Sequence, residues 1–519
     1  MSRRIQTIVL GGLAMVMAVG WALVSTGPAA AVIGSTEARQ PYSFMASVQY
    51  ESPRSDGHRC GGVLIAPQWV LTAGHCANTP TGATVAVPRG WKVRVGSLST
   101  DTGGELVEVG KFYRRHNRYD PAGEDLTLLH LKHAVKAKPV TLSTGTPADG
   151  TAVRILGWGA TSEACFGEFN DRTCFPGQLH QADTKVVPLA QCWDEDGNTL
   201  PLCIGSREPA VGAGNMDSGG PALMRVNGDW VLAGTVIGPG TRGADLPVMY
   251  TDISKNRDWV NGIITGTNVP ADSVIPDMEG SATVGDCRGA VVRPRTARPQ
   301  DKALVLTNGH CVAGSRPAPG KALVDRPAGL DAPVVIADAA GYPQASARAE
   351  RLVYATMTGT DIALYRLDKT YARLTTEGAK VFDLTTRPLR AGDSFAFLNQ
   401  MARPTCSVEA VVPHLREAGW QQDKSVRYAL ADACTSRPGD SGSPLVSLGG
   451  GTVLGINNTH NDSGERCTES NPCEVGLDGT VVVREGHSYG QQVHQIAGCL
   501  NKSSALDLKR AGCSLTARR

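Results

Sequence analysis

Two stretches of this chain each contain a histidine beside a cysteine, an aspartate that opens an apolar run, and a serine in a glycine-rich turn. In the first stretch the segments are Leu-Thr-Ala-Gly-His-Cys at 71–76, Glu-Asp-Leu-Thr-Leu-Leu at 124–129 and Asp-Ser-Gly-Gly-Pro at 217–221. In the second they are Leu-Thr-Asn-Gly-His-Cys at 306–311, Thr-Asp-Ile-Ala-Leu-Tyr at 360–365 and Gly-Asp-Ser-Gly-Ser-Pro at 439–444. A serine hydroxyl becomes an effective nucleophile when a neighbouring base takes its proton and a carboxylate orients that base. The sequence therefore holds the residue types for two Ser-His-Asp sites.

The spacing of these residues is nearly the same in the two stretches, which indicates a duplicated unit. The interval between His75 and Asp125 differs by one residue from that between His310 and Asp361. In the first unit we assign Ser218 as nucleophile, His75 as general base and then acid, and Asp125 as the group that fixes the imidazole tautomer. The same roles in the second unit are assigned to His310, Asp361 and Ser441.

The chain order His, Asp, Ser is one of three unrelated orders that build this geometry. It matches the chymotrypsin order, and both units resemble the chymotrypsin/trypsin-like serine peptidase family over nearly all of the mature chain. The second unit resembles the divergent bacterial branch that includes glutamyl endopeptidases, because Gly-Asp-Ser-Gly-Ser-Pro replaces Asp-Ser-Gly-Gly-Pro. The resemblance implies an all-β protein with two tandem chymotrypsin-like double β-barrel domains and disulfides.

The pattern along the chain favours the same fold class. Short runs rich in Val, Ile, Leu and Thr recur between Gly, Pro and Asp turns, for example at 62–65, 69–72, 91–95, 153–157 and 230–236. Residues 252–264 have apolar positions at helical spacing and predict one helix. The length of 519 residues suits two domains of about 200–250 residues.

The predicted organisation has five parts. The first, 1–31, is typical of a signal peptide, with Arg3 and Arg4 ahead of an apolar run and small residues at 29–31. A membrane anchor is the alternative, but the apolar run is short, so we expect a secreted, extracellular protein without a stable membrane anchor. The remaining parts are a first peptidase domain at 32–265, a linker at 266–281, a second peptidase domain at 282–500 and a loosely held basic tail at 501–519.

The charge of the chain excludes some partners. Charged residues make up 19% of the sequence and the net charge is +2, so no polyanion or membrane-surface partner is implied. There is no basic tract with interleaved aromatic residues, and nucleic-acid binding is not supported. The resemblance implies protein or peptide substrates, with protein inhibitors as potential partners.

Fourteen cysteines, an even number in an exported chain, indicate a disulfide framework. Spacing suggests Cys60–Cys76 and Cys287–Cys311, and the family resemblance implies Cys192–Cys203. Proximity and then elimination add Cys165–Cys174, Cys467–Cys473, Cys499–Cys513 and Cys406–Cys434. Zinc is the competing interpretation, but no Cys-x-x-Cys pair accompanies a matching histidine pair, so we expect neither a metal nor another cofactor.

The resemblance also implies how the first site is activated. Val32-Ile33-Gly34 is similar to the family's Ile-Val-Gly-Gly start, whose free α-amino group pairs with the aspartate before the serine, here Asp217. Cleavage of the signal after Ala31 would expose this amine, so we expect that the first domain needs no separate activating cut. The second domain lacks such a start. Either another group holds its oxyanion loop, or cleavage near 281–284 activates it.

By the same resemblance, the backbone N–H groups of Met216 and Ser218 form the first oxyanion hole, and those of Gly439 and Ser441 form the second. Met216 departs from the usual glycine, so we expect a side chain where the substrate approaches and a peptide that is harder to orient. The family's Ser-Trp-Gly reads Val236-Ile237-Gly238, without the serine that bonds the catalytic Asp.

The residues expected at the specificity pockets are mostly neutral. Gly212 at the floor, Gly238 on the substrate strand and Val248 at the wall predict a preference for small or medium apolar side chains at the first site. Thr435 at the second floor suggests a neutral pocket. Asn457 follows Gly455-Ile456, so glutamate specificity is not supported, and His460 is expected to be a solvated loop residue.

The leading interpretation is a secreted serine endopeptidase that acts through an acyl-enzyme. One alternative is that one domain is catalytically silent and serves as a regulatory or binding module. Another is a secreted pseudo-peptidase scaffold. An esterase or lipase is disfavoured, because those enzymes use Gly-x-Ser-x-Gly and place the histidine last in the chain.

Overall fold

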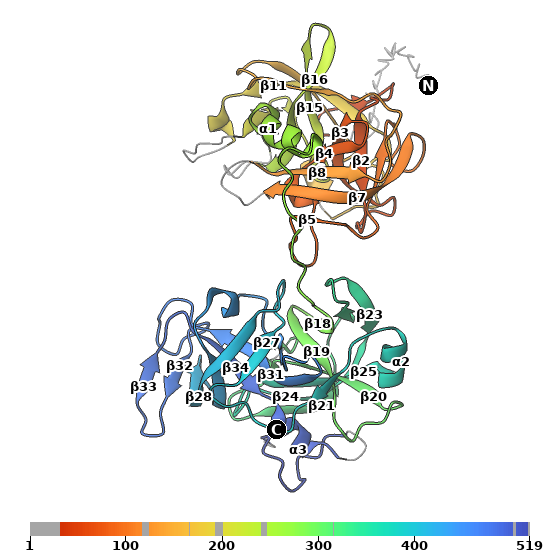
Figure 1. Ribbon diagram of the computed structural model, residues 1–519. Helices are drawn as coiled ribbons and strands as arrows, with labels where there is room; N and C mark the ends of the chain where they lie inside the picture. The colour runs from red at the N-terminus through yellow and green to blue at the C-terminus, as the bar shows by residue number, and fades with distance from the viewer. Residues whose placement is uncertain are drawn as a thin grey trace, which may run out of the picture. The chain divides into compact units, whose positions relative to one another are not determined.

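The computed structural model describes residues 32–116, 124–165, 167–192, 201–239, 246–314, 316–501 and 505–516. The predicted signal peptide, 1–31, lies outside these residues. The chain forms two compact units, both rich in strands (Figure 1). One unit contains Val87–Pro270 and the chain before Asn78, and the other contains Ala271–Arg519 together with the loop Asn78–Ala86. That loop is bonded to the segment after Pro270, since Ser273 Oγ accepts from the backbone N–H groups of Thr84 and Val85.

The first unit contains two closed barrels of six strands each. The strands of the first barrel are β2 (Met45–Gln49), β3 (His58–Ala66), β4 (Trp69–Thr72), β6 (Lys92–Val95), β7 (Glu105–His116) and β8 (Leu126–Leu131). Those of the second are β10 (Ala152–Gly157), β11 (His180–Val187), β12 (Leu202–Ile204), β15 (Pro221–Val226), β16 (Asp229–Pro239) and β17 (Val248–Asp252). The short strands beside them in this unit are β1 (Thr36–Glu37), β9 (Thr141–Leu142), β13 (Ser206–Arg207) and β14 (Ala210–Val211), whereas β5 (Val85–Ala86) belongs to the loop assigned to the other unit.

The helix predicted at 252–264 is α1 (Ile253–Ile264). Asp252 caps it, because its side chain accepts from the backbone N–H of Ser254 and so satisfies one of the unpaired donors of the first turn. Val260 and Ile263 on its apolar face are buried. The chymotrypsin-like all-β class is therefore confirmed for this unit, with one helix where the sequence placed it.

The second unit repeats the double-barrel plan. Its first half contains β18 (Ser281–Val284), β19 (Cys287–Arg293), β20 (Lys302–Thr307), β21 (Ala322–Pro327), β22 (Val334–Ala337), β23 (Pro343–Ala347), β24 (Ala349–Thr356), β25 (Ile362–Thr370) and α2 (Tyr371–Thr376). The second half contains β26 (Phe382–Leu384), β27 (Ser394–Phe397), β28 (Thr405–Glu417), β29 (Trp420–Tyr428), β30 (Pro444–Val446), β31 (Thr452–His460), β32 (Cys473–Val475), β33 (Val481–Val483), β34 (Ser488–Gln492) and α3 (His494–Cys499). Strands β27, β28, β29, β34, β31 and β30 close the second barrel.

Alternating side chains explain how these strands hold two barrels together. On β20, Ala303 and Val305 enter one core cluster, while Leu304 and Leu306 enter another. The second cluster also contains Ile456 and other residues of the second barrel. The strand is therefore apolar on both faces, one turned into its own barrel and the other toward the neighbouring barrel.

Seven disulfides join the cysteines in the pairs suggested above: Cys60–Cys76, Cys165–Cys174, Cys192–Cys203, Cys287–Cys311, Cys406–Cys434, Cys467–Cys473 and Cys499–Cys513. Two of them tie β3 and β19 to the turns that carry the candidate catalytic histidines. Such cross-links stabilise a fold mainly by restricting the unfolded chain. None of the helices in the described residues is long and apolar enough to cross a membrane.

The C-terminal segment differs from the loosely held tail that the sequence suggested. Leu515 is buried in the core of the second unit, and Leu506 and Leu508 pack partly against the same cluster. The Tyr354 hydroxyl donates to the carbonyl of Thr516. These leucines explain the difference, because burying their side chains outweighs the basic character of the segment.

Candidate active sites

The first histidine is held by a buried carboxylate. His75 lies in the short turn Gly74–Cys76 after β4, and Asp125 immediately precedes β8. His75 Nδ1 lies 2.6 Å from Asp125 Oδ2, and the backbone N–H of His75 donates to Oδ1 at 2.7 Å. Asp125 is 1% exposed. A carboxylate bonded at Nδ1 leaves Nε2 free to accept a proton, which is the state a general base needs.

Ser218 lies on the same cavity as His75. The cavity has a volume of about 500 Å³ and is lined by both residues, together with Met216, Gly238 and Val248. The backbone carbonyl of Ser218 accepts from the N–H of Gly61 at 2.9 Å, which fixes the serine turn of the second barrel against β3 of the first. The structure thus brings together the three residues that the sequence assigned to the first triad.

The second unit repeats this arrangement. His310 Nδ1 lies 2.7 Å from Asp361 Oδ2, and Oδ1 accepts from the backbone N–H groups of Gly309 and His310 at 2.6 and 3.0 Å. Burial by itself would lower the pKa of His310, but the Asp361 carboxylate raises it above its usual value, with a contribution from Glu417. His310 and Ser441 line one cavity of about 270 Å³.

The first oxyanion loop is held from both sides of Met216. The carbonyl of Asn215 accepts from the N–H of Ala160 at 2.7 Å. Because C=O and N–H point in opposite directions in a trans peptide, this bond turns the Met216 N–H away from Ala160. On the other side, His58 Nε2 donates to the carbonyl of Met216 at 3.1 Å, and Ser47 Oγ lies 2.7 Å from His58 Nδ1. Burial lowers the pKa of His58 to about 3, so this ring is neutral.

The side chain of Met216 lies on the cavity, where the sequence placed it, but little of it is exposed. Although it borders the cavity, it is 8% exposed and packs with Ala160, Cys165 and Phe175. Its φ of 73° is in the left-handed region, which is unfavourable for a residue with a Cβ. The side chain packs in the apolar cluster beside the Cys165–Cys174 disulfide, and the left-handed φ agrees with the expectation of a peptide that is harder to orient.

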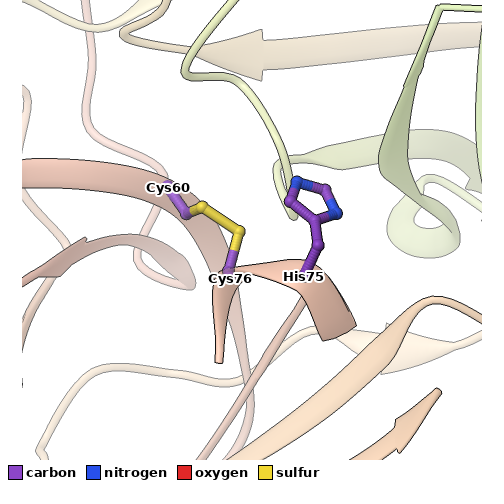
Figure 2. Close-up of side chains that lie close together, drawn as sticks. All are labelled: Cys60, His75 and Cys76. Atoms are coloured by element: carbon purple, nitrogen blue, oxygen red, sulfur yellow. A yellow bond between two sulfur atoms is a disulfide. The ribbon is translucent and has the colours of Figure 1, made fainter. Parts of the chain in front are cut away.

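Two side-chain clusters have spacing that could suggest a metal. Cys60, His75 and Cys76 lie close together, with donor atoms within 4.8 Å of one another, as do Cys287, His310 and Cys311 (Figure 2 shows the first cluster). In both clusters the two sulfurs are joined in a disulfide, so they are not the thiolates that bind zinc. The histidine Nδ1 atoms are bonded to aspartates. These donor sets do not fit a metal.

Comparisons with known families agree with this geometry. A family model described as Trypsin matches residues 32–260, and one described as Trypsin-like peptidase domain matches residues 287–456. The chain belongs to the trypsin-like serine peptidase family. Trypsin alpha-4 of Lucilia cuprina is 29% identical over 222 residues, which cover 41% of this chain and 80% of that protein. The structure of mouse neuropsin aligns with 24% identity over 45% of this chain and all of that one, with a TM-score of 0.36.

In this trypsin-like frame, Asp217 of the first domain is a buried carboxylate that forms no ion pair within the described residues, although the Arg54 charge acts on it. It is 1% exposed and accepts from the N–H groups of Gly159 and Gly214 at 2.7 and 2.8 Å. Burial raises its pKa to about 7. Gly157 shows how close the side chains of Asp217 and Val32 come to each other. If this glycine carried a Cβ, that atom would lie 1.8 Å from Asp217 Oδ1 and 3.3 Å from Val32 Cγ2. The side chains of Asp217 and Val32 therefore border the same small space.

Gly212 pairs with Ile33 through two backbone hydrogen bonds and does not line the cavity. A Cβ at Gly212 would lie 2.1 Å from Leu246 Cδ2 and 3.4 Å from Val248 Cγ2. Leu246 therefore occupies the space that a larger residue at 212 would need, although it does not line the cavity either, and this packing follows from the register of the chain around β17.

The second pocket differs from the sequence interpretation in two residues. Ser436, not Thr435, lines the cavity, and the Thr435 hydroxyl donates to the carbonyl of Ala431. His460 is the last residue of β31, lines the cavity and has Nδ1 3.1 Å from Ser488 Oγ, so it is not a solvated loop residue. Its strand extends further than the sequence suggested. Burial lowers the pKa of His460.

The second cavity also contains Glu417, which no sequence pattern identified. It lies at the end of β28, and its carboxylate accepts from Thr459 Oγ1 at 3.0 Å and from the N–H of Ser470 at 2.8 Å. Burial raises its pKa to about 7. The long hairpin of β28 and β29 brings Glu417 into the cavity. The length of this hairpin is the signal in the sequence that could have indicated its position.

The packing of Met216 leads to a testable expectation. Met216→Ala should destabilise the first domain by about 2–4 kcal/mol, because a buried methionine is truncated. It should also slow the reaction of Ser218 with a fluorophosphonate probe, since the oxyanion peptide loses its anchor. Denaturant unfolding and labelling rates measure both effects.

Met45→Ala is the matched control, because Met45 is fully buried on β2, away from the loop. It should destabilise the domain to a similar extent and leave the labelling rate unchanged. Equal labelling rates in both variants would contradict the anchoring role of Met216.

Proposed function

We propose that the protein is a secreted serine endopeptidase that hydrolyses peptide bonds at two Ser-His-Asp sites. The observation that carries the proposal is the repeated pair, His75 with Asp125 and His310 with Asp361, each bonded at Nδ1 and each on a cavity that also contains the serine. Membership of the family supports protein or peptide substrates. The signal-like start and the disulfides support an extracellular location.

In the proposed mechanism the serine Oγ attacks the scissile carbonyl while histidine Nε2 accepts its proton. The backbone N–H groups of Met216 and Ser218, or of Gly439 and Ser441, bind the developing oxyanion. The histidinium then protonates the leaving amine, and an acyl-enzyme remains on the serine. Water, deprotonated by the same histidine, hydrolyses the acyl-enzyme and restores the hydroxyl.

For the first domain we propose activation by exposure of Val32. A free α-amino group at Val32 would border the space beside Asp217 and supply the directly paired cation that this carboxylate lacks among the described residues. A buried carboxylate is far more stable when paired, so the new ion pair would fix Asp217 and, through the N–H groups of Gly159 and Gly214, the loop that ends at Ser218.

Labelling with a fluorophosphonate tests the main proposal. The wild-type protein should be labelled at both Ser218 and Ser441. Ser218→Ala and Ser441→Ala should each retain one label, and the double variant should retain none. Intact-mass analysis counts the labels. A single label lost completely with one variant would make the other domain a regulatory or binding module, and an unlabelled wild type would favour a scaffold.

A pH series tests the role of Val32. In a protein extended by two residues before Val32, Asp217 keeps its raised pKa of about 7, so the folded state binds a proton that the unfolded state has released. The free energy of unfolding of this extended protein should therefore fall, by a few kcal/mol, as pH rises from about 4 to about 7. A protein that starts at Val32 should not show this loss in denaturant unfolding.

Asp217→Asn in the extended protein is the control, because it removes the titrating group and should remove the pH-dependent loss. If the two N-termini gave the same pH profile, the pairing of Val32 with Asp217 would be wrong.

The pocket of the first domain predicts its specificity. In a Ser441→Ala background, peptides with Ala or Val before the scissile bond should react faster than those with Arg, because Gly212 carries no counter-charge and Leu246 fills the space beside it. Leu246→Ala should improve cleavage after Leu or Phe by about tenfold, as expected for added apolar space. Ratios of kcat/KM measure the change. Preferential cleavage after Arg would rule out this pocket.

A further inference from the structure

Among the described residues, no α-amino group pairs with the buried Asp440 of the second domain. The segment 281–284, where an activating cut was one option, is strand β18, and it pairs with both β19 and β22. Ala282 and Val284 are fully buried in the barrel core. A cut there would break a barrel strand, and moving the new terminus would expose this apolar surface. Another group must therefore hold the loop from 436 to 440, which we call the second oxyanion loop.

The two domains have a position that is structurally equivalent but chemically different. In the first domain, Gly219 N–H donates to the carbonyl of Val236, and Val236 N–H donates to that of Gly220, both at 2.9 Å. In the second, Gly442 and Ser443 form the same two bonds with Asn457, at 3.0 and 2.8 Å. Asn457 therefore replaces Val236. A fully buried amide in place of an apolar side chain is costly unless all its polar atoms are bonded.

The side chain of Asn457 is bonded at both ends of the second oxyanion loop. Its Nδ2 donates to Ser436 Oγ at 2.7 Å and to the carbonyl of Asp440 at 3.1 Å. Its Oδ1 accepts from the Tyr428 hydroxyl at 3.2 Å. One amide, fixed from behind by a buried tyrosine, thus connects the first and last residues of the loop to strand β31.

Gln400 holds the middle of the same loop. Its Nε2 donates to the carbonyl of Pro438 at 2.8 Å, and its backbone N–H donates to Asp440 Oδ1 at 3.0 Å. The carbonyl of Pro438 and the N–H of Gly439 belong to one peptide and point in opposite directions. Gln400 does not line the cavity, whereas Pro438 and Ser441 do. The bond to Gln400 therefore turns the Gly439 N–H toward the cavity side, as Ala160 does for Met216 in the first domain.

We propose that Asn457, together with Gln400, is a positioning residue that keeps the second oxyanion loop in its working shape, so that the second site is assembled on folding and needs no new N-terminus. This inference rests on the proposed peptidase function of the second domain. It assigns different regulation to the two sites: the first depends on an α-amino group, and the second on side chains already within the fold.

The test uses the full-length protein carrying Ser218→Ala, so that only Ser441 reacts. Asn457→Val, which installs the residue of the first domain, should slow fluorophosphonate labelling of Ser441 by about 10²-fold or more, the usual effect of losing an oxyanion donor. Gln400→Met keeps the length of the side chain but removes its donor. It should lower kcat with little change in KM on a peptide substrate. Because Gln400 is only half-buried, this variant reports on positioning without endangering the fold.

Gln492→Ala is the matched control, since Gln492 is a buried amide in the same barrel that bonds to Leu389 and Lys424 and not to the loop. It should destabilise the domain in denaturant unfolding and leave labelling of Ser441 unchanged. A wild-type rate in both Asn457→Val and Gln400→Met would overturn the positioning role alone. Labelling of Ser441 that required a cut in the linker would overturn assembly on folding. No labelling under any condition would overturn both this inference and the proposed activity of the second domain.

Discussion

The bond between a buried aspartate and the histidine turn is the interaction on which both halves of the molecule depend. Asp125 and Asp361 each precede a strand of the first barrel and accept from the ring and the backbone of a histidine. A carboxylate in such a position is tolerated only when its oxygens are bonded, and the short turns after β4 and β20 supply those donors. The serine comes from the other barrel, so the apolar contact between barrels sets the remaining distance.

The two domains also differ in how they stabilise the buried aspartate that precedes each serine. Asp217 and Asp440 both accept two backbone N–H groups, and in both domains these donors lie in equivalent loops. In the first domain the carboxylate has a raised pKa and lies beside Val32. In the second, a buried amide at 457 and a glutamine at 400 add direct bonds to the loop. The two buried aspartates therefore have different surroundings, and in the second domain these include the Arg288 guanidinium.

Sequence alone identified what depends on local patterns. The His–Asp pairs, the strand-rich fold and helix α1 follow from motifs, alternation and capping near Asp252. What it missed depends on register and on contacts between distant segments. Leu246 fills the space above Gly212 because β17 pairs with β12 and β16, and Glu417 reaches His310 because β28 is long. The burial of Leu515 likewise requires a surface that only the folded barrels provide.

The Cys165–Cys174 loop has a consequence for where the first site can exist. The loop covers the apolar cluster that holds Met216 in its left-handed conformation. If both sulfurs were reduced, the loop could move away from the cluster. The strained backbone at Met216 would then lose the side-chain packing that stabilises it. The geometry of the oxyanion hole is thereby coupled to the redox potential of the surroundings. If the protein is exported as proposed, a newly made chain would lack that cover in a reducing cytosol and gain it in an oxidising exterior.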